Sequence, residues 1–497
     1  MVKLEHLIDS FVNKFNALPT FWLVYFLLCA NHLMPIMTEN EEMYYGLARQ
    51  FIEPEWIPNS FVFTESPGTR LLFQLSIGPI LTLVPFEWVS IVGQLITYGI
   101  YAWLLVKIFA YFKLSNVLIF FLLQLLFMTL QAFLAGEWIF RNFETKSIAY
   151  IFIFLSIINL LKTEWKKAVL WCVPAFYFHV LVGGWYFIAL MIFLLLKKLA
   201  FKQLFGYGLW FLLLTSPFLA YLFNDILISQ EKIIAGVNLD WVYTYFRNPH
   251  HTVTFHMGWP WFRRHRAEGI AMLILAAILG AALYPKSKEN YVKNTWLFCF
   301  STYALLWFFL LVSYLDTNGS ILKFYVYRIA SVSFLLTLVL LLYHLATWLK
   351  DKKFANLIYF ACLLASLIYL PIKIADNIRK ETHKKTELDQ ALIDVLRQKG
   401  QAGQSVAFFD KSFKTYFPRE TRLEPVVSFK FVPSGTEKLF EWYTRLQEKE
   451  KAEENPALIR NYCNKYGAKF IVSKQPIEGF TIILENEAYY VYEVIAE

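Results

Sequence analysis

Three carboxylates follow directly after the first long apolar stretch of the chain, residues 18–37; they are Glu39, Glu41 and Glu42. Ionised carboxylates at the end of a membrane helix are costly to desolvate and contribute little to packing, so such a group indicates a functional site. Its chemistry would be general base catalysis, in which a carboxylate takes the proton of an attacking hydroxyl. We predict Glu41 as the first candidate base and Glu42 as the second. The alternative is a solvated helix end, where acids are tolerated.

Basic side chains that could stabilise a leaving phosphate lie in the other polar loops. The growing negative charge on a phosphate ester needs guanidinium or ammonium groups nearby. The predicted phosphate-binding or donor-binding residues are Arg328, Lys323, Arg263, Arg264 and Arg141. For Arg328 and Lys323 the alternative is extension to the membrane interface, which long basic side chains commonly adopt.

Other polar or aromatic residues near the same helix ends are predicted to contact a donor or an acceptor. They are Tyr44, Tyr45, Glu137, Glu144, His179 and Tyr325. For Glu137 and Glu144 the alternative is pairing with the neighbouring bases Arg141 and Lys146. For His179, which lies near the end of an apolar helix, the alternative is a hydrogen bond between helices.

The histidines of one loop raise the question of a metal. They are His250, His251, His256 and His265. Their spacing matches no recognised ligand pattern, so we predict no metal site and no cofactor. A divalent metal held by these histidines and a carboxylate is the alternative.

Membrane helices must position these residues. The chain of 497 residues is 57% hydrophobic, 19% aromatic and 17% charged, which is too apolar for a soluble protein of this length. We predict a polytopic α-helical membrane protein with about 11 transmembrane helices, each approaching the roughly 20 apolar residues that a bilayer requires. The expected segments are residues 18–37, 87–110, 115–135, 147–161, 168–182, 184–196, 204–223, 269–284, 294–314, 325–347 and 354–372. Residues 71–85 could form an interfacial or re-entrant helix instead.

Lysines gather in alternate connections between these segments, and positive loops stay cytoplasmic. We therefore predict a multi-pass protein of the cytoplasmic (inner) membrane with its N-terminus inside and residues beyond about 372 outside. The net charge of +9 is accounted for by this topology and by anionic lipid head groups, so nucleic acid is not an expected partner.

The predicted domains are a membrane module, residues 1–372, and a small external α/β domain, residues 373–497. The expected external loops of the membrane module are residues 38–86, 136–146, 224–266 and 316–324. In the external domain we expect helices over 381–399 and 437–466. The expected strands are residues 405–409, 426–432, 469–472, 481–484 and 489–495.

The segment Asn40-Glu41-Glu42-Met43-Tyr44 and its position carry a family resemblance. Acids in a long first external loop, many further spans and an external C-terminal domain resemble the GT-C integral membrane glycosyltransferases, which use polyprenyl-phosphate donors. The protein mannosyltransferase and aminoarabinose transferase group is the most similar. Those enzymes often have Asp-Glu-Ala-x-Tyr here, and this chain has Asn40 in place of the leading Asp.

The resemblance implies inverting transfer of a sugar to an acceptor on the external (periplasmic) face of the membrane, with a carboxylate as base. Activated nucleotide sugars are cytoplasmic, so an outward-facing enzyme needs a lipid-linked donor. The acceptor would be a lipid, a glycan or a protein. Two alternatives stay open: a transporter or flippase of a lipid-linked or amphipathic solute, and a polysaccharide polymerase or ligase.

Overall fold

The computed structural model describes residues 2–34, 36–129, 131–135, 137–223, 232–379 and 385–495. The chain folds into two compact units. Unit 1 comprises Met1–Met34, Ile91–Leu219 and Tyr243–Lys380, and unit 2 comprises Pro35–Ser90, Ala220–Val242 and Glu381–Glu497. The site residues predicted from the sequence are thus divided between the two units.

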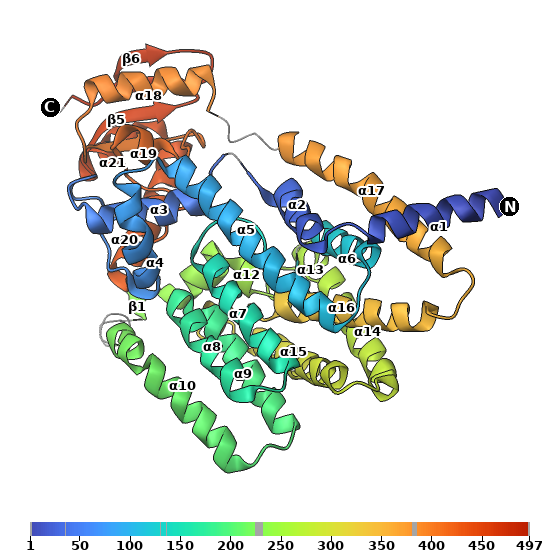
Figure 1. Cartoon of the computed structure of the whole chain (residues 1–497). Helices are drawn as coiled ribbons and strands as arrows, with labels where there is room; N and C mark the ends of the chain where they lie inside the picture. The colour runs from blue at the N-terminus through green and yellow to red at the C-terminus, as the bar shows by residue number, and fades with distance from the viewer. Residues whose placement is uncertain are drawn as a thin grey trace. The chain divides into compact units, whose positions relative to one another are not determined.

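Unit 1 consists of helices. They are α1 (Val2–Asn16), α2 (Thr20–His32), α6 (Asn116–Met128), α7 (Thr145–Leu161), α8 (Trp165–Phe178), α9 (Val180–Leu196), α12 (Pro249–Thr252), α13 (Trp259–His265), α14 (Ala267–Leu283), α15 (Asn290–Leu315), α16 (Ala330–Leu349) and α17 (Ala355–Arg379). Most of α5 (Phe86–Tyr111) and α10 (Phe201–Leu222) also belongs to this unit. The helices α7, α8 and α9 pack side by side, α15 packs against α9 and α16, and α17 packs against α1, α2 and α6 (Figure 1).

Each apolar segment expected to span the membrane overlaps one of these helices. Six helices of the described chain are long and apolar enough to cross a bilayer: those over Phe86–Tyr111, Phe201–Leu222, Ala267–Lys286, Asn290–Leu315, Ala330–Leu349 and Ala355–Ala375. Four others, α2, α6, α7 and α9, are apolar but shorter. The chain is therefore a multi-pass membrane protein, whereas the count of 11 spans and the orientation of the termini stay predictions.

The break between the fifth and sixth expected segments lies earlier than predicted. The helix α8 ends at Phe178 and α9 begins at Val180, so the chain bends at His179 and not at the boundary expected after residue 182. The backbone N–H of Val182 donates to His179 Nδ1 at 3.3 Å, which satisfies one of the free N–H groups at the start of α9. Gly183 lies inside α9, where a Cβ would meet Phe176 N at 2.3 Å, so its role is close packing.

In unit 2 the first expected external loop, residues 38–86, is largely helical. It contains α3 (Glu39–Ile52), a short 3-10 turn η1 (Gly68–Arg70) and α4 (Leu71–Leu81), which packs against α3. A Cβ on Gly78 would lie 2.5 Å from the Ala48 carbonyl oxygen, so only glycine permits this close approach of the two helices. The unit also contains the hairpin β1 (Ile233–Ile234) and β2 (Val237–Asn238), followed by α11 (Leu239–Trp241).

The C-terminal part of unit 2 is an α/β fold around one sheet. Its strands are β3 (Ser405–Phe408), β4 (Glu424–Pro425), β5 (Ala468–Ser473), β6 (Thr481–Glu485) and β7 (Tyr490–Glu493), in the order β4-β3-β5-β7-β6. The first three of that order are parallel, and β7 and β6 join antiparallel. Its helices are α18 (Glu387–Lys399), α19 (Phe417–Thr421), α20 (Thr436–Glu454) and α21 (Ile459–Lys465).

Two expectations for this part of the chain were wrong in their bounds. The helix expected over residues 437–466 is interrupted at Asn455, where α20 ends, and η7 (Pro456–Leu458) precedes α21. No strand forms over residues 426–432, and the strand in this region is β4, which ends at Pro425. The Ser428 carbonyl accepts the indole N–H of the buried Trp442 at 2.8 Å, so this segment packs against α20 and leaves the sheet. Residues 381–384 of the first expected helix lie outside the described residues.

Candidate functional site

The N-terminus of α3 carries the acids predicted to be catalytic. Thr38 caps this helix: its Oγ1 accepts from Glu41 N at 3.4 Å, and Glu41 Oε2 accepts from Thr38 N at 3.0 Å. This reciprocal capping box explains why the helix starts here, and acids in the first turn also interact favourably with the helix dipole. The acids are therefore held on a defined helix end.

Glu41 is fully buried and both of its oxygens accept hydrogen bonds. Besides the bond from Thr38 N, Oε2 accepts from Thr38 Oγ1 at 3.0 Å, and Oε1 accepts from Ser90 Oγ at 2.6 Å. These contacts fix the carboxylate against the start of its own helix. The base role predicted for Glu41 stays a prediction.

Glu42 is also buried and forms a bidentate ion pair with Arg419 of α19. Arg419 Nε donates to Oε2 and Nη2 donates to Oε1, both at 3.0 Å. Arg419 Nη1 donates in addition to Glu87 Oε1 at 2.5 Å and to Glu420 Oε1 at 3.0 Å. One guanidinium thus lies among three carboxylates, and we name Glu42, Glu87, Arg419 and Glu420 the acidic cluster.

Burial and pairing act in opposite directions on the acidic cluster. Burial raises the pKa of Glu42, and the positive charge of Arg419 offsets only part of that effect. Burial alone would lower the pKa of Arg419, but the carboxylates of Glu42, Glu87 and Glu420 outweigh it and raise that pKa. We take the ion pair as formed, because the guanidinium has more than one carboxylate partner. Glu42 then has a higher pKa than a solvated glutamate, which suits a general base.

The neighbouring predicted residues of α3 serve in packing and in contacts with the C-terminal part of unit 2. Tyr45 is fully buried with its ring 5.9 Å from that of Phe86, and Arg70 lies over the Tyr44 ring at 5.4 Å. Asn40, where the family motif has Asp, accepts from Lys430 Nζ at 2.7 Å. No negative charge is needed at position 40 for that bond.

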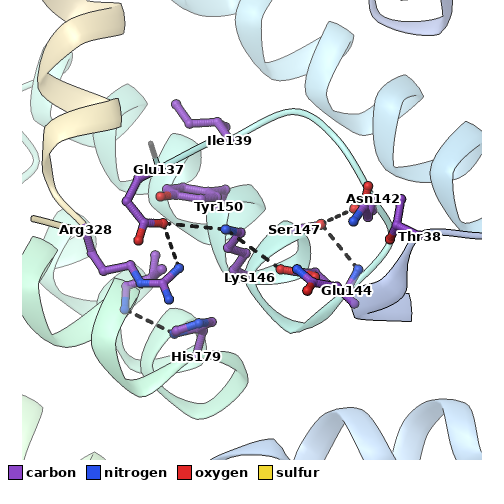
Figure 2. Close-up of polar contacts among 12 residues, drawn as sticks. Thr38, Glu137, Ile139, Asn142, Glu144, Lys146, Ser147, Tyr150, His179 and Arg328 are labelled. Carbon is purple, nitrogen blue, oxygen red and sulfur yellow. Dashed lines mark hydrogen bonds and ion pairs between the residues drawn. The ribbon is translucent and has the colours of Figure 1, made fainter. Parts of the chain in front are cut away.

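Unit 1 contains a second buried charge cluster, centred on Glu137 (Figure 2). Arg328 Nη1 donates to Glu137 Oε2 at 2.8 Å, and Lys146 Nζ lies 3.5 Å from the same oxygen. Lys146 Nζ is also 3.9 Å from Glu144 Oε1. Glu137, Glu144 and Lys146 are buried, and the side chain of Arg328 is 11% exposed. We name Glu137, Glu144, Lys146 and Arg328 the cationic cluster, because its basic side chains share Glu137 as their common partner.

The surroundings of Glu137 keep it ionised. Burial alone would raise its pKa, but Arg328 and Lys146 outweigh burial and lower the pKa of Glu137 to about 2. His251 Nδ1 lies 3.6 Å from Glu137 Oε1 and 3.1 Å from the Ala135 carbonyl oxygen. Burial lowers the pKa of His251, so it is neutral and its Nδ1–H donates to Ala135. Within the described residues, Glu137 Oε1 has no hydrogen-bond donor.

Two other predicted contact residues adjoin the cationic cluster. The Tyr325 ring lies 4.6 Å from the Arg328 guanidinium and 5.7 Å from the His251 ring. Figure 2 shows His179 beside Arg328, with its Nδ1 occupied by Val182 N. Arg328 lies two residues before α16, which begins at Ala330 and not at residue 325 as expected. Its side chain therefore comes from a loop.

The remaining predicted cations lie outside this cluster. Arg141, Arg263 and Arg264 are exposed, and Lys323 lies over the Phe324 ring at 5.5 Å. Arg266, which was not predicted, is the buried arginine of its segment, and it donates to the carbonyls of Val253, Pro249 and His250. Arg266 thus serves the local fold. In the described parts of the chain, no group of three or more His, Cys, Asp or Glu side chains could hold a metal ion.

Sequence reasoning missed Arg419 and His251 as neighbours of these predicted acids. Arg419 is 377 positions from Glu42, and no local pattern connects them. Pairing of Lys146 with Glu137 and Glu144 was the alternative stated for these acids, and the structure shows it, at 3.5 and 3.9 Å. For His251 the neighbouring His250 made any pairing ambiguous.

No protein-family model matches the sequence, and no related curated protein is found. Among solved structures, the chain is similar to a crystal structure of ArnT from Cupriavidus metallidurans bound to undecaprenyl phosphate. The similarity covers 98% of each chain, with 10% sequence identity and a TM-score of 0.47. At this TM-score and identity, the likeness supports no conclusion about the activity of this chain.

Proposed function

We propose that this protein is a membrane glycosyltransferase that moves a sugar from a polyprenyl-phosphate-linked donor to an acceptor on the external face of the membrane. The observation that carries the proposal is the opposite arrangement of charges around the central residue of each cluster, a cation in the acidic cluster and a carboxylate in the cationic cluster. In the acidic cluster three carboxylates share one guanidinium, and in the cationic cluster Lys146 and Arg328 share Glu137. A base and a phosphate-binding site need these opposite charges.

The proposed step is a single inverting displacement. The oxygen of an acceptor hydroxyl forms a bond to the anomeric carbon while the bond between that carbon and the phosphate oxygen breaks. The hydroxyl proton passes to a glutamate of α3, and the polyprenyl phosphate leaves with the electron pair. Cations near a leaving group stabilise its charge, and Arg328 stays the residue predicted from the sequence to bind the phosphate.

Of the two predicted bases, we propose Glu42. The contacts of Glu41 with Thr38 and Ser90 hold the start of its own helix, whereas the partner of Glu42 is the Arg419 guanidinium, which favours the deprotonated form that a base needs. The pKa of Glu42 is raised by burial, and a base whose pKa approaches the operating pH is more effective. Glu41 would then orient the helix end that carries Glu42.

The test is transfer by the purified protein, reconstituted in lipid nanodiscs, from a panel of polyprenyl-phosphate-linked sugars. We expect E42Q to lower turnover by roughly 10²- to 10⁴-fold, the usual contribution of a general base. E41Q should lose less activity and more thermal stability. The matched control is Glu39→Gln, in the same turn, where the side chain is 46% exposed. Unchanged turnover in both E41Q and E42Q would reject a catalytic role for these acids.

A transporter or flippase is the second candidate, because buried ionisable groups such as Glu137 and Lys146 in a membrane protein also mark solute pathways. The same nanodisc preparation separates the two, since a flippase leaves the donor chemically unchanged. A polymerase or ligase would share the donor chemistry and differ in the acceptor. Mass analysis of the product with glycan and lipid acceptors distinguishes these outcomes.

A further inference from the structure

The guanidinium that contacts Glu42 comes from the C-terminal part of the chain. Arg419 belongs to α19, which lies between the parallel strands β3 and β4, and it reaches Glu42 with two hydrogen bonds of 3.0 Å. Its side chain is 18% exposed, and that of Glu42 is 4% exposed. A bidentate pair in such a site restricts the carboxylate to one orientation. Arg419 is therefore placed to control both the position and the charge of Glu42.

The surrounding contacts make this placement rigid. Ser60 Oγ and Val62 N donate to the buried Glu424 carboxylate of β4, at 2.6 and 2.9 Å. Ser434 N donates to Glu65 Oε2 at 2.9 Å. Each of these bonds joins the segment that follows α3 to the C-terminal fold, and together they hold α19 next to the start of α3.

We propose that Arg419 is a positioning residue for the transfer reaction, and that the C-terminal fold completes the catalytic site by supplying it. The inference rests on the proposed function, in which Glu42 is the base. It assigns the C-terminal fold a part in the chemistry, where the sequence had left its role open. Arg419 acts through Glu42 and does not itself touch the donor.

The cluster also contains the groups that would compete for Arg419. Glu87 and Glu420 both contact Nη1, whereas Nε and Nη2 serve Glu42. Glu420 in turn pairs with Lys385 at 3.1 Å and with Arg397 at 2.8 Å. Loss of Arg419 would therefore leave Glu42 beside Glu87 with no cation among the described residues in direct contact, and repulsion between like charges would favour the protonated form of Glu42.

The experiment compares the pH dependence of kcat/KM for the full-length wild type and Arg419→Gln. Glu42 acts as a base only when it is deprotonated, so the acidic limb of the profile reports its pKa in the free enzyme. Because Arg419 favours the carboxylate, R419Q should raise that pKa and move the acidic limb to higher pH by about 1 to 3 pH units. A lower melting temperature with an unmoved limb would overturn the inference and leave Arg419 as a structural ion pair.

Two further variants complete the design. Arg419→Lys keeps the charge but loses the bidentate geometry, so it should lower kcat while shifting the limb less than R419Q does. The matched control is Arg422→Gln, the same charge change at an exposed position three residues away, which should leave the limb in place. A limb that moves equally in R422Q would show a general charge effect and contradict the inference.

A spectroscopic readout separates failure of this inference from failure of the proposed function. The protonated Glu42 carboxyl has an infrared C=O band that E42Q lacks, and its titration requires no turnover. We expect R419Q to raise the pH at which this band disappears. If no donor is turned over but the band shifts, the proposed function fails and the coupling of Arg419 to Glu42 stands. If transfer occurs and neither the band nor the limb shifts, the inference fails alone.

Discussion

The acidic cluster of unit 2 and the cationic cluster of unit 1 are built with opposite arrangements of charge. In the first, Arg419 is the central cation and carboxylates surround it. In the second, Glu137 is the central carboxylate, with Arg328 and Lys146 around it. Each centre is a single charge with more than one partner of opposite sign. Each cluster therefore depends on its central residue, whose loss would leave the surrounding groups of like charge without their common partner.

The two clusters also differ in how the chain assembles them. Glu137, Glu144 and Lys146 lie within ten residues of one another, and only Arg328 is distant. The acidic cluster joins Glu42 to residues more than 300 positions away. A local cluster depends on one loop, whereas the long-range cluster depends on how well the C-terminal fold is formed. Stability should therefore be affected differently by mutation in the two units.

The substitution Glu137→Gln is expected to have the largest effect on the free energy of unfolding. It removes the shared carboxylate and leaves Arg328 and Lys146 buried without a common counter-charge, which should cost about 3 to 5 kcal/mol of unfolding free energy. The measurement is thermal and chemical unfolding of the protein in detergent. Glu164→Gln, which disrupts an exposed pair with Lys167 at 3.0 Å, is the control and should change stability by less than about 1 kcal/mol. Equal losses in the two variants would contradict a central role for Glu137.

The next effect concerns Glu424, a buried carboxylate of unit 2 that accepts from Ser60 and Val62. Burial raises its pKa from 4.5 to about 7, and the hydrogen bonds from Ser60 and Val62 only partly oppose this. An acid with a raised folded-state pKa contributes stability that is fully present below the unfolded pKa, near 4.5, and is lost as the pH rises through about 7. The expected change is up to about 3 kcal/mol.

The check is the melting temperature of wild type and Glu424→Gln between pH 4 and pH 8, a range of about four units around these pKa values. Stability of the wild type relative to E424Q should fall as the pH rises. Arg445 and Lys438, the cations that act on Glu424, are present in both proteins. A flat difference would show that the pKa of Glu424 is the same in the folded and unfolded states.

A smaller effect is expected on donor binding from Arg328→Gln. A charged hydrogen bond to a phosphate contributes about 1.5 to 3 kcal/mol, so KM for the lipid-linked sugar should rise roughly 10- to 100-fold. Arg264→Gln, at an exposed position on α13 that was also predicted to bind the donor, should change KM by less than about fivefold. The reverse order would place the phosphate at α13 and remove the cationic cluster from the site.

The sequence predicted where the helices lie, but it did not predict which charged side chains pair with one another. Apolar runs long enough to cross a bilayer predicted the helices, because hydrophobic length is a local property. The acids after the first helix and Arg328 were also recognisable, since charge beside an apolar segment is unusual. The bend at His179 was missed, because the apolar residues on both sides of it continue to residue 182, and Gly183 lies inside α9, where it permits close packing against Phe176.

The pairings of the acids could not be predicted for a physical reason. Glu41 belongs to the capping box of its own helix. Thr38, three residues earlier, is a recognisable capping signal, but that signal does not exclude a catalytic role for the Glu41 carboxylate. Glu42 is paired with Arg419, and the C-terminal segment around Arg419 has no feature that marks it as a partner of α3. Adjacent glutamates of one helical turn point in different directions, so their neighbours are set by tertiary packing.

The smallest expected effect distinguishes the two adjacent glutamates. Thr38→Ala removes the side-chain cap of α3 and one donor to Glu41, which should cost about 1 kcal/mol of unfolding free energy. If Glu42 is the base and Glu41 only orients the helix end, kcat should fall by less than about tenfold, because the pair with Arg419 is retained. Thr386→Ala removes the equivalent cap of α18 and is the matched control, with a similar loss of stability and no loss of kcat. A loss of kcat in T38A as large as that of E42Q would mean that the orientation of Glu41 is as important to the reaction as the charge of Glu42, and that the acid next to the cap belongs to the chemistry.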